Sequence, residues 1–221
     1  MDIFFHVYLK SGYSRILLNK FKKFKDSGLY EKTNKIYLTL FGGEINPHLE
    51  FLDELKSVYP KIELVLISNP EFNNEPDTLN FMLEKAKEYS SNTPMLYLHT
   101  KGLSYTHPLI KKNVEAWVRY LDLYTINKWE ENITSLESND VSGPFFCDGI
   151  NNKHFQGNFW WANSNYIKGL PKITGDNFNK LNRGEYWACF KAENINAMSP
   201  ISPVDLYQTY FCNEADFPSG W

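Results

Sequence analysis

Four consecutive residues, His99-Thr100-Lys101-Gly102, follow an apolar run and carry groups that can bind an anion. A lysine supplies a point charge for phosphate, a threonine supplies a hydroxyl, and a glycine allows close approach to the backbone. The histidine can donate to an anionic oxygen or bind a metal. Taken alone, such a tetrapeptide is more often an ordinary polar turn after a strand.

A second polar and aromatic segment, HFQGNFWWAN, spans residues 154–163. Trp160 and Trp161 are adjacent on an expected strand, so their side chains face opposite sides of it. One indole can then line a cleft while the other packs in the core. His154 and Asn158 add groups that hydrogen-bond sugar hydroxyls. The structural alternative is a core aromatic pair beside a polar turn.

Common catalytic and cofactor-binding motifs are absent from the sequence. It contains no P-loop, no dinucleotide-binding glycine fingerprint, no serine nucleophile elbow and no His-Glu-x-x-His pattern. Cys147, Cys189 and Cys212 are odd in number and widely spaced, so they predict neither a disulfide framework nor a metal site. We interpret all three as small core residues.

The 221-residue chain has a formal net charge of −3, which does not favour nucleic acid or an anionic membrane as a partner. Its one basic run, residues 20–25, alternates with phenylalanines and predicts the solvated face of an amphipathic helix rather than a membrane-surface segment. No apolar stretch is long enough for a membrane span, and residues 1–10 lack the features of a signal peptide. We therefore expect a soluble, cytoplasmic protein.

The first hundred residues alternate between strand and helix patterns. The expected strands are 3–9, 35–41, 62–67 and 95–98. The expected helices between them are 13–24, 46–58 and 77–86, the last two with caps at Asn46 and Asp77. The apolar run of the third strand predicts cover on both faces. This rhythm predicts an α/β fold with a mostly parallel, Rossmann-like sheet, helices on both faces, and a ligand site at the carboxyl ends of the strands.

The second half of the chain is less regular. It predicts a long helix over 110–124, a shorter one over 129–136, and strands at 141–146 and 159–162. No repeat, low-complexity tract or linker divides the sequence, so we expect a single domain over residues 1–221.

Both motifs and their surroundings resemble a family of glycosyltransferases found in bacterial polysaccharide clusters and large DNA viruses. The shared order is HTKG after a strand, a long helix with Trp117 and Arg119, HFQGNFWWAN, and Arg-x-Glu-x-Trp at 183–187. The resemblance extends to FHVY at 5–8, SGLY at 27–30 and EPDTL at 75–79, and so covers most of the chain. It implies a type-A glycosyltransferase fold, in agreement with the βαβ pattern.

The resemblance implies transfer of a hexosyl or pentosyl unit from a nucleotide-sugar donor to a hydroxyl of a glycan acceptor, and we expect inversion at the anomeric carbon. Residues 1–108 would form the donor half and residues 109–221 the acceptor half. The expected donor-binding residues are Tyr8, Glu75, Asp77, His99, Thr100, Lys101 and Gly102. The expected acceptor-binding residues are His154, Asn158, one of Trp160 and Trp161, and Arg183.

Two carboxylates compete for the role of catalytic base. Glu185 lies between Arg183 and Trp187, close to the expected acceptor wall, and in the resembled family an acid recurs there. Asp148 follows the strand expected at 141–146, but the glycine after it makes a plain turn aspartate equally plausible. A surface ion pair with Arg183 is the structural alternative for Glu185. We choose Glu185 as the base, ahead of Asp148.

A metal requirement stays open at this stage. Many type-A enzymes carry Asp-x-Asp at the end of the fourth strand, where it holds a divalent metal against the donor diphosphate. His99-Thr100-Lys101 stands in that place here. Lys101 and His99 can neutralise the leaving diphosphate directly, so the sequence does not decide whether Mn²⁺ or Mg²⁺ is used.

Two other functions compete with sugar transfer. A non-catalytic carbohydrate-binding domain could use the same aromatic cleft. A nucleotidyltransferase on a similar sheet ranks last, because residues 10–13, Lys-Ser-Gly-Tyr, match its glycine-rich, basic first loop poorly.

Overall fold

The computed structural model describes residues 1–67, 70–103, 107–149, 152–199 and 213–217. Cys212 lies outside these residues. Among the described residues, no helix combines the length and the apolar character needed to cross a membrane.

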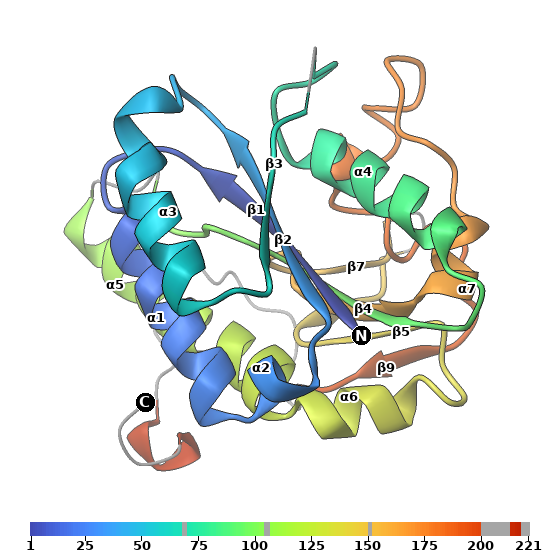
Figure 1. Ribbon diagram of the computed structural model, residues 1–221. Coiled ribbons are helices and arrows are strands. Elements are labelled where there is room, and N and C mark those ends of the chain that lie inside the picture. The colour runs from blue at the N-terminus through green and yellow to red at the C-terminus, as the bar shows by residue number, and fades with distance from the viewer. Residues whose placement is uncertain (68–69, 104–106, 150–151, 200–212, 218–221) are drawn as a thin grey trace.

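A seven-stranded mixed sheet with the order β3-β2-β1-β4-β8-β5-β9 forms the centre of the molecule (Figure 1). The parallel part consists of β1 (Asp2–Tyr8), β2 (Lys35–Phe41), β3 (Ile62–Val65) and β4 (Pro94–His99). β8 (Trp160–Asn163) is antiparallel to β4 and to β5 (Val141–Gly143), and β9 (Ile195–Ala197) is parallel to β5. β6 (Phe146–Cys147) and β7 (His154–Phe155) form a separate antiparallel pair. The predicted α/β class with a mostly parallel sheet is confirmed.

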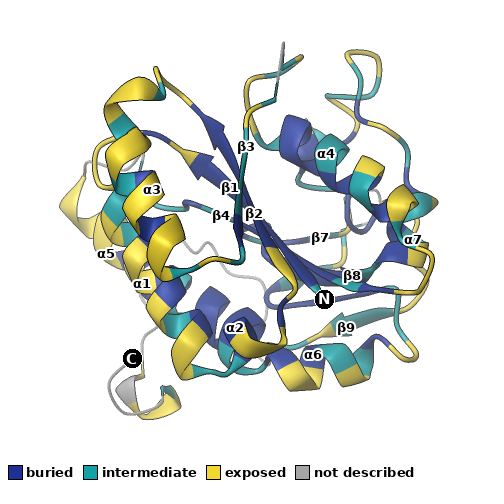
Figure 2. Cartoon of the chain, viewed as in Figure 1, coloured by how far each residue is buried: buried dark blue, intermediate teal, exposed yellow. Residues whose placement is uncertain are grey.

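Helices cover both faces of this sheet, as predicted. One face carries α1 (Tyr13–Asp26), α2 (Leu29–Lys32), α3 (Leu49–Val58), α5 (Pro108–Asp122) and α6 (Trp129–Ser135). The other carries α4 (Glu75–Glu88) and α7 (Ser164–Lys168), together with the irregular segment 170–192. A π-helix, Leu123–Asn127, continues α5, and short 3₁₀ turns lie at Asn46–His48, Asn182–Gly184 and Glu214–Asp216. The inner strands β1, β2, β4, β5 and β8 are therefore buried from both sides (Figure 2).

Three local expectations are wrong. β3 ends at Val65, and Leu66 is 61% exposed, because β3 is an edge strand that helices cover incompletely. Asn46 lies in a 3₁₀ turn without a side-chain cap, and α3 begins three residues later. The strand expected at 141–146 is broken by Phe145, whose φ of 53° interrupts an extended backbone.

The cap of α4 also differs from the prediction. Asn74 is the N-cap residue, and its side-chain oxygen accepts from the backbone N–H of Glu75 at 2.9 Å. Asp77 lies at the third helical position, where it closes a capping box. Its carboxylate accepts from the backbone N–H groups of Glu71, Phe72 and Asn74. The helix therefore starts two residues earlier than expected, with Glu75 in its first turn.

A buried ion pair joins α1 to the end of α5. Lys20 and Lys23 both donate to Asp122, and Lys20 is only 2% exposed. The expectation that the whole basic run is solvated is therefore wrong for Lys20. Burial lowers the pKa of Lys20 to about 8, although the charge of Asp122 acts to raise it. The ammonium of Lys20 also lies 4.9 Å from the ring centre of Phe159, in the segment that precedes β8.

We predict that Asp122→Asn lowers the free energy of unfolding by about 3–5 kcal/mol, because it leaves a buried lysine without its counter-charge. Asp26→Asn is the matched control, since Asp26 pairs with Lys22 of the same helix but is exposed, and its loss should cost about 0.5 kcal/mol or less. Urea unfolding of both variants measures the difference. Equal effects would mean that the buried pair does not hold α1 and α5 together.

Candidate functional site

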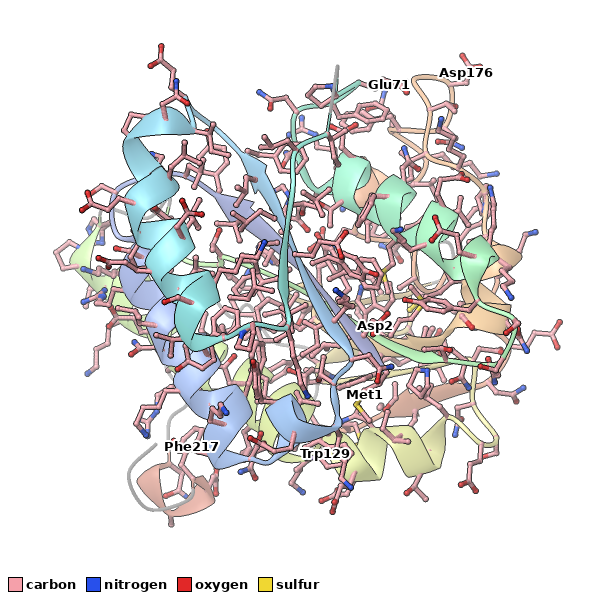
Figure 3. The ribbon with its side chains drawn as sticks, viewed as in Figure 1. Met1, Asp2, Glu71, Trp129, Asp176 and Phe217 are labelled. Carbon is pink, nitrogen blue, oxygen red and sulfur yellow. The ribbon has the colours of Figure 1, made fainter. Side chains whose placement is uncertain are left out.

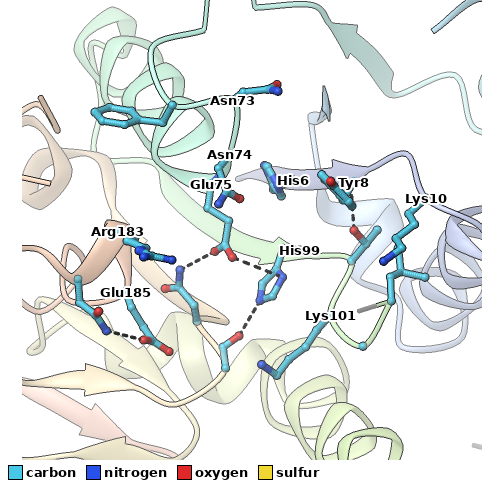
Figure 4. A pocket seen from close by; sticks show the side chains of 17 residues that line it. His6, Tyr8, Lys10, Asn73, Asn74, Glu75, His99, Lys101, Arg183 and Glu185 are labelled. Carbon is cyan, nitrogen blue, oxygen red and sulfur yellow. Dashed lines mark hydrogen bonds and ion pairs between the residues drawn. The ribbon is translucent and has the colours of Figure 1, made fainter. Parts of the chain in front are cut away.

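A cavity of about 760 Å³ opens at the carboxyl ends of β1 and β4 (Figure 4). Strand ends contribute His6, Tyr8, Lys10 and residues 99–103 to its lining. The entry to α4 contributes residues 72–75. The far wall comes from later in the chain and consists of Gly157, Asn158, Asn182, Arg183 and Glu185. The cavity thus lies where ligands bind in open α/β sheets, and both halves of the chain line it.

A row of polar side chains crosses the floor beneath the first turn of α4. Thr39, His6 and His99 are neighbours in the register of β2, β1 and β4, so their side chains share one face of the sheet. The hydroxyl of Thr78 on α4 lies 2.9 Å from Nδ1 of His6 and 2.6 Å from Oγ1 of Thr39. Glu75, one turn earlier on α4, faces His99. This row attaches the start of α4 to the sheet.

Glu75 is held by residues from two other segments. Its Oε2 accepts from the hydroxyl of Tyr97 at 2.9 Å and from the side-chain amide of Asn158 at 2.8 Å. Its Oε1 lies 3.8 Å from Nδ1 of His99. Burial alone would raise the pKa of Glu75, but the charges of His99 and His6 and both hydrogen bonds lower it to about 2. Glu75 is therefore ionised throughout the physiological pH range.

The turn at Gly157 and Asn158 positions both Glu75 and His99. The backbone carbonyl of Gly157 accepts from Nε2 of His99 at 3.0 Å, so that nitrogen carries a proton. Asn158 donates to Glu75 and accepts from Nε1 of Trp160 at 2.9 Å. Both turn residues have left-handed φ angles, 93° and 53°. A Cβ on Gly157 would lie 2.9–3.1 Å from Leu121 and Trp117, so only glycine fits there.

Lys101 brings a positive charge to the cavity. Its Nζ lies 3.8 Å from the ring centre of Trp117, on a helix that packs beneath the strand end. Burial lowers the pKa of Lys101 to about 8, while Glu75 and Glu185 oppose that change. Thr100 is buried next to it, and its hydroxyl accepts from the backbone N–H of Tyr8 at 2.9 Å. The two strand ends are thereby fixed to each other.

Glu185 reaches the cavity from a strained loop. Asn182, Arg183 and Gly184 have φ angles of 44°, 57° and 102°, three left-handed residues in succession. Oε2 of Glu185 accepts from the side-chain amide of Asn182 at 2.7 Å. Burial raises the pKa of Glu185, His154 and Lys101 lower it in part, and the charge of Glu75 raises it further. The two cavity carboxylates thus have pKa values moved in opposite directions.

The loop that carries Glu185 is docked on α4. The side chain of Asn80 makes two hydrogen bonds to the backbone of Ile173, at 2.8 and 2.9 Å. Phe72 and Phe178 stack with ring centres 4.6 Å apart. Glu71 accepts from the backbone N–H of Gly175 at 2.9 Å, and Figure 3 shows Glu71 and the neighbouring Asp176 at one edge of the molecule. These contacts fix the far wall of the cavity relative to the entry of α4.

Most of the residues predicted to bind a donor line the cavity. They are Tyr8, Glu75, His99, Thr100, Lys101 and Gly102. Asp77 does not line it, because three backbone N–H groups of its own helix entry occupy its carboxylate. Its expected place in the donor site is therefore wrong.

The predicted acceptor residues divide into two groups. Asn158 and Arg183 line the cavity. His154 does not: its Nδ1 donates to the backbone carbonyl of Asn152 at 2.7 Å, and its ring packs against Tyr186. The expectation that Trp160 or Trp161 lines a cleft is wrong, because both are fully buried. The central strand β8 is covered on both faces, so alternation sends one indole into each core.

The structure separates the two candidate bases. Glu185 lines the cavity, whereas Asp148 is exposed after β6 and does not. Sequence reasoning missed His6, Lys10, Asn73, Asn74, Gly157 and Asn182, which also line it. For His6 and Lys10 the available signal was their place in and just after the first strand. Asn73 and Asn74 precede α4 directly.

The residues at the end of β4 do not fit a divalent metal. Thr100 offers a hydroxyl that already accepts from a backbone N–H, and Lys101 is a cation. Within the described ranges, no group of three or more His, Cys, Asp or Glu residues is placed to hold a metal ion. His99 is committed through Nε2 to the carbonyl of Gly157.

Comparison with known proteins gives a family and a fold. Residues 4–198 match the family model described as Domain of unknown function (DUF8361). Among solved structures, galactosyltransferase LgtC in complex with donor and acceptor sugar analogs matches with a TM-score of 0.51 and 10% identity, over 89% of this chain and 73% of that chain. An active-site mutant of LgtC matches with a TM-score of 0.46 and 11% identity, over 89% and 72%. No curated protein sequence matches. The fold is therefore the type-A-like fold that the sequence predicted.

We predict that Glu75 makes stability depend on acid pH. Because its pKa is depressed from 4.5 to about 2 on folding, it stabilises the fold above pH 4.5, and that contribution is lost as the pH falls toward 2. The unfolding free energies of wild type and Glu75→Gln should therefore converge by about 3 kcal/mol over this window. Urea unfolding at several pH values measures this. Glu84→Gln, an exposed position on α4, is the control and should leave the profile unchanged.

Proposed function

The chain belongs to the family described as Domain of unknown function (DUF8361), and we propose that it is a glycosyltransferase. It moves a hexosyl or pentosyl unit from a nucleotide-sugar donor to a hydroxyl of a glycan acceptor, with inversion at the anomeric carbon. The observation that carries the proposal is the cavity at the ends of β1 and β4, in which Lys101 stands at the place expected for the donor diphosphate. The fold likeness to galactosyltransferase LgtC supports sugar transfer, and inversion is proposed independently of it.

The charges of the cavity support an anionic donor. Lys10, Lys101 and Arg183 outnumber Glu75 and Glu185, while His6 is neutral at pH 7. In the proposal, Lys101 holds the diphosphate, His99 positions Glu75 and the Gly157 turn beside it, Thr100 and Gly102 shape the backbone beneath it, and Tyr8 contacts the nucleotide. Charge-assisted hydrogen bonds of this kind contribute about 1.5–3 kcal/mol each. Residues 1–108 then form the donor half of a single domain, and residues 109–221 the acceptor half.

Glu185 is the proposed base. Its raised pKa makes it a better proton acceptor than an ordinary glutamate, and it lies across the cavity from the strand ends. It takes the proton of the acceptor hydroxyl as that oxygen bonds to the anomeric carbon. The bond from this carbon to the diphosphate oxygen breaks, and the diphosphate leaves with the electron pair next to Lys101. Asn158 and Arg183 contact the acceptor. The two buried tryptophans, Trp160 and Trp161, take no part in this contact.

The carbohydrate-binding alternative loses its support. It relied on an indole in an open cleft, and Trp160 and Trp161 are both buried. Cations and carboxylates facing one cavity favour chemistry over simple stacking on a sugar ring.

Donor binding tests the proposal directly. A panel of nucleotide-sugars, each with and without Mn²⁺, is screened for a thermal shift and for slow release of free nucleotide. A donor at 100 times its dissociation constant should stabilise the fold by about 2.7 kcal/mol. We predict that Lys101→Met, which keeps the apolar stem over Trp117, weakens donor binding by about 10-fold to 100-fold. Lys111→Met, exposed on α5, is the control and should bind normally.

Binding should also weaken in alkali. The pKa of Lys101 is about 8, so its charge is present below that pH and lost above it. Donor affinity of the wild type should fall between pH 7 and pH 9, and that of Lys101→Met should not. Full affinity in Lys101→Met would refute the assigned place of the diphosphate.

For the base, we predict that Glu185→Gln lowers turnover by about 10²-fold to 10⁴-fold, whereas Asp148→Asn retains it. Both substitutions are nearly isosteric, and donor binding of both should stay close to wild type. Turnover is measured with the donor and acceptor that the screen identifies, and the anomeric configuration of the product is read by NMR. Normal turnover in Glu185→Gln would remove Glu185 as the base, and loss in Asp148→Asn alone would transfer the role to Asp148.

A further inference from the structure

A buried histidine faces the cavity with one ring nitrogen uncommitted. His6 is 3% exposed and stacks on Phe41 with ring centres 4.8 Å apart. Its Nδ1 lies 2.9 Å from the hydroxyl of Thr78, on the side of α4. Nε2 lies on the other side of the ring, and within the described part of the chain no partner is recorded for it. Because His6 lines the cavity, this nitrogen is available to a ligand.

The hydrogen bonds around His6 determine which of its nitrogens carries the proton. The hydroxyl of Thr39 donates to the backbone carbonyl of Phe5 at 3.4 Å, which uses its only hydrogen. Thr78 therefore donates to Thr39 across the 2.6 Å contact, and Nδ1 of His6 donates to Thr78. The assignment follows from the network. It leaves Nε2 with a lone pair and no proton.

His6 stays neutral under physiological conditions. Burial lowers its pKa to about 4; the charge of Glu75 raises the pKa and that of His99 lowers it. Nε2 is thus a fixed hydrogen-bond acceptor at any pH near 7. Because Nε2 opens on the cavity, a ligand that donates a hydrogen bond can satisfy this acceptor.

The chemistry of this corner selects a hydroxyl rather than a phosphate. Figure 4 shows His6 between Tyr8 and Glu75, on the opposite side of His99 from Lys101. Both Nε2 of His6 and the ionised Glu75 accept hydrogen bonds, and a phosphate ester offers only acceptors at neutral pH. A hydroxyl group, in contrast, donates to either of them.

We propose that His6 is a specificity residue whose Nε2 accepts a hydrogen bond from a hydroxyl of the nucleotide-sugar donor. This rests on the proposed function. Thr78 is a positioning residue, because its hydroxyl holds the proton on Nδ1. The hydroxyl belongs either to the ribose or to the transferred sugar, and both present the same chemistry to the imidazole.

The test combines a protein change with a ligand change. In His6→Asn, the side-chain amide takes the place of Nδ1 and can still donate to Thr78, but no acceptor replaces Nε2. The ligands are UDP, GDP, ADP and CDP with their 2′-deoxy analogues, and UDP-glucose with its single-deoxy sugar analogues, measured by calorimetry. In the wild type, one of these deletions should weaken binding by about tenfold. In His6→Asn, parent and analogue should bind equally. The ligand that shows this coupling identifies ribose or sugar as the source.

Three results would overturn the inference. They are unchanged discrimination in His6→Asn, a loss of affinity that is the same for parent and deoxy ligands, and wild-type binding that no hydroxyl deletion affects. If the wild type binds none of these nucleotides, the proposed function fails as well, which separates that failure from the others. Thr78→Val, at a residue that does not line the cavity, is a second variant in case His6→Asn folds poorly. It should bind the parent nucleotide about as weakly as the deoxy analogue, because the proton is no longer held on Nδ1. Full discrimination in Thr78→Val would also count against the proton assignment.

Discussion

The carboxylate of Glu75 is the group on which the arrangement of the cavity depends. A half-buried charge of this kind is costly unless other groups compensate it. The compensation comes from Tyr97 on β4 and from Asn158 in the turn before β8, with His99 nearby. These partners lie on two segments, β4 and the turn before β8, so the charge is stable only when α4, β4 and this turn are assembled together. A local electrostatic requirement therefore fixes long-range geometry.

The same assembly divides the cavity into two ends of different polarity. The Gly157–Asn158 turn packs against Trp117, and the ammonium of Lys101 lies over the ring of the same tryptophan. Glycine at 157 lets the turn approach the indole, and the indole holds the cation near the strand end. On the α4 side, His6 and Glu75 present acceptors only. A ligand that has an anionic group at one end and hydroxyls at the other matches this division, and a nucleotide-sugar is such a ligand.

The sequence predicted those features that depend on local pattern. β2 has the predicted bounds, and β1 and β4 differ from theirs by a residue or so, because apolar runs in buried parallel strands are distinct. The HTKG segment reaches the cavity because strand ends gather at one edge.

The Trp160–Trp161 pair was misjudged, since alternation predicts opposite faces but not that both faces are covered. Asp77 was misjudged for a different reason: a carboxylate three residues past a cap serves its own helix. His6 was overlooked because its one signal, a place in the first strand, does not say which face of the sheet meets the cavity.

The place of Lys101 also bears on how this fold can manage a leaving diphosphate. A divalent metal such as Mg²⁺ is held by one or two carboxylates together with the substrate's phosphates, and those carboxylates offset part of its charge. At this strand end Lys101 supplies one positive charge, and its place over the ring of Trp117 lowers the cost of keeping it dehydrated near an anion. Burial lowers the pKa of Lys101 to about 8, so a fraction of the lysine is neutral near pH 7. A bound anion stabilises the charged form. In the proposed reaction such a cation is strongest when the diphosphate is present, so donor binding would reinforce the charge that assists departure.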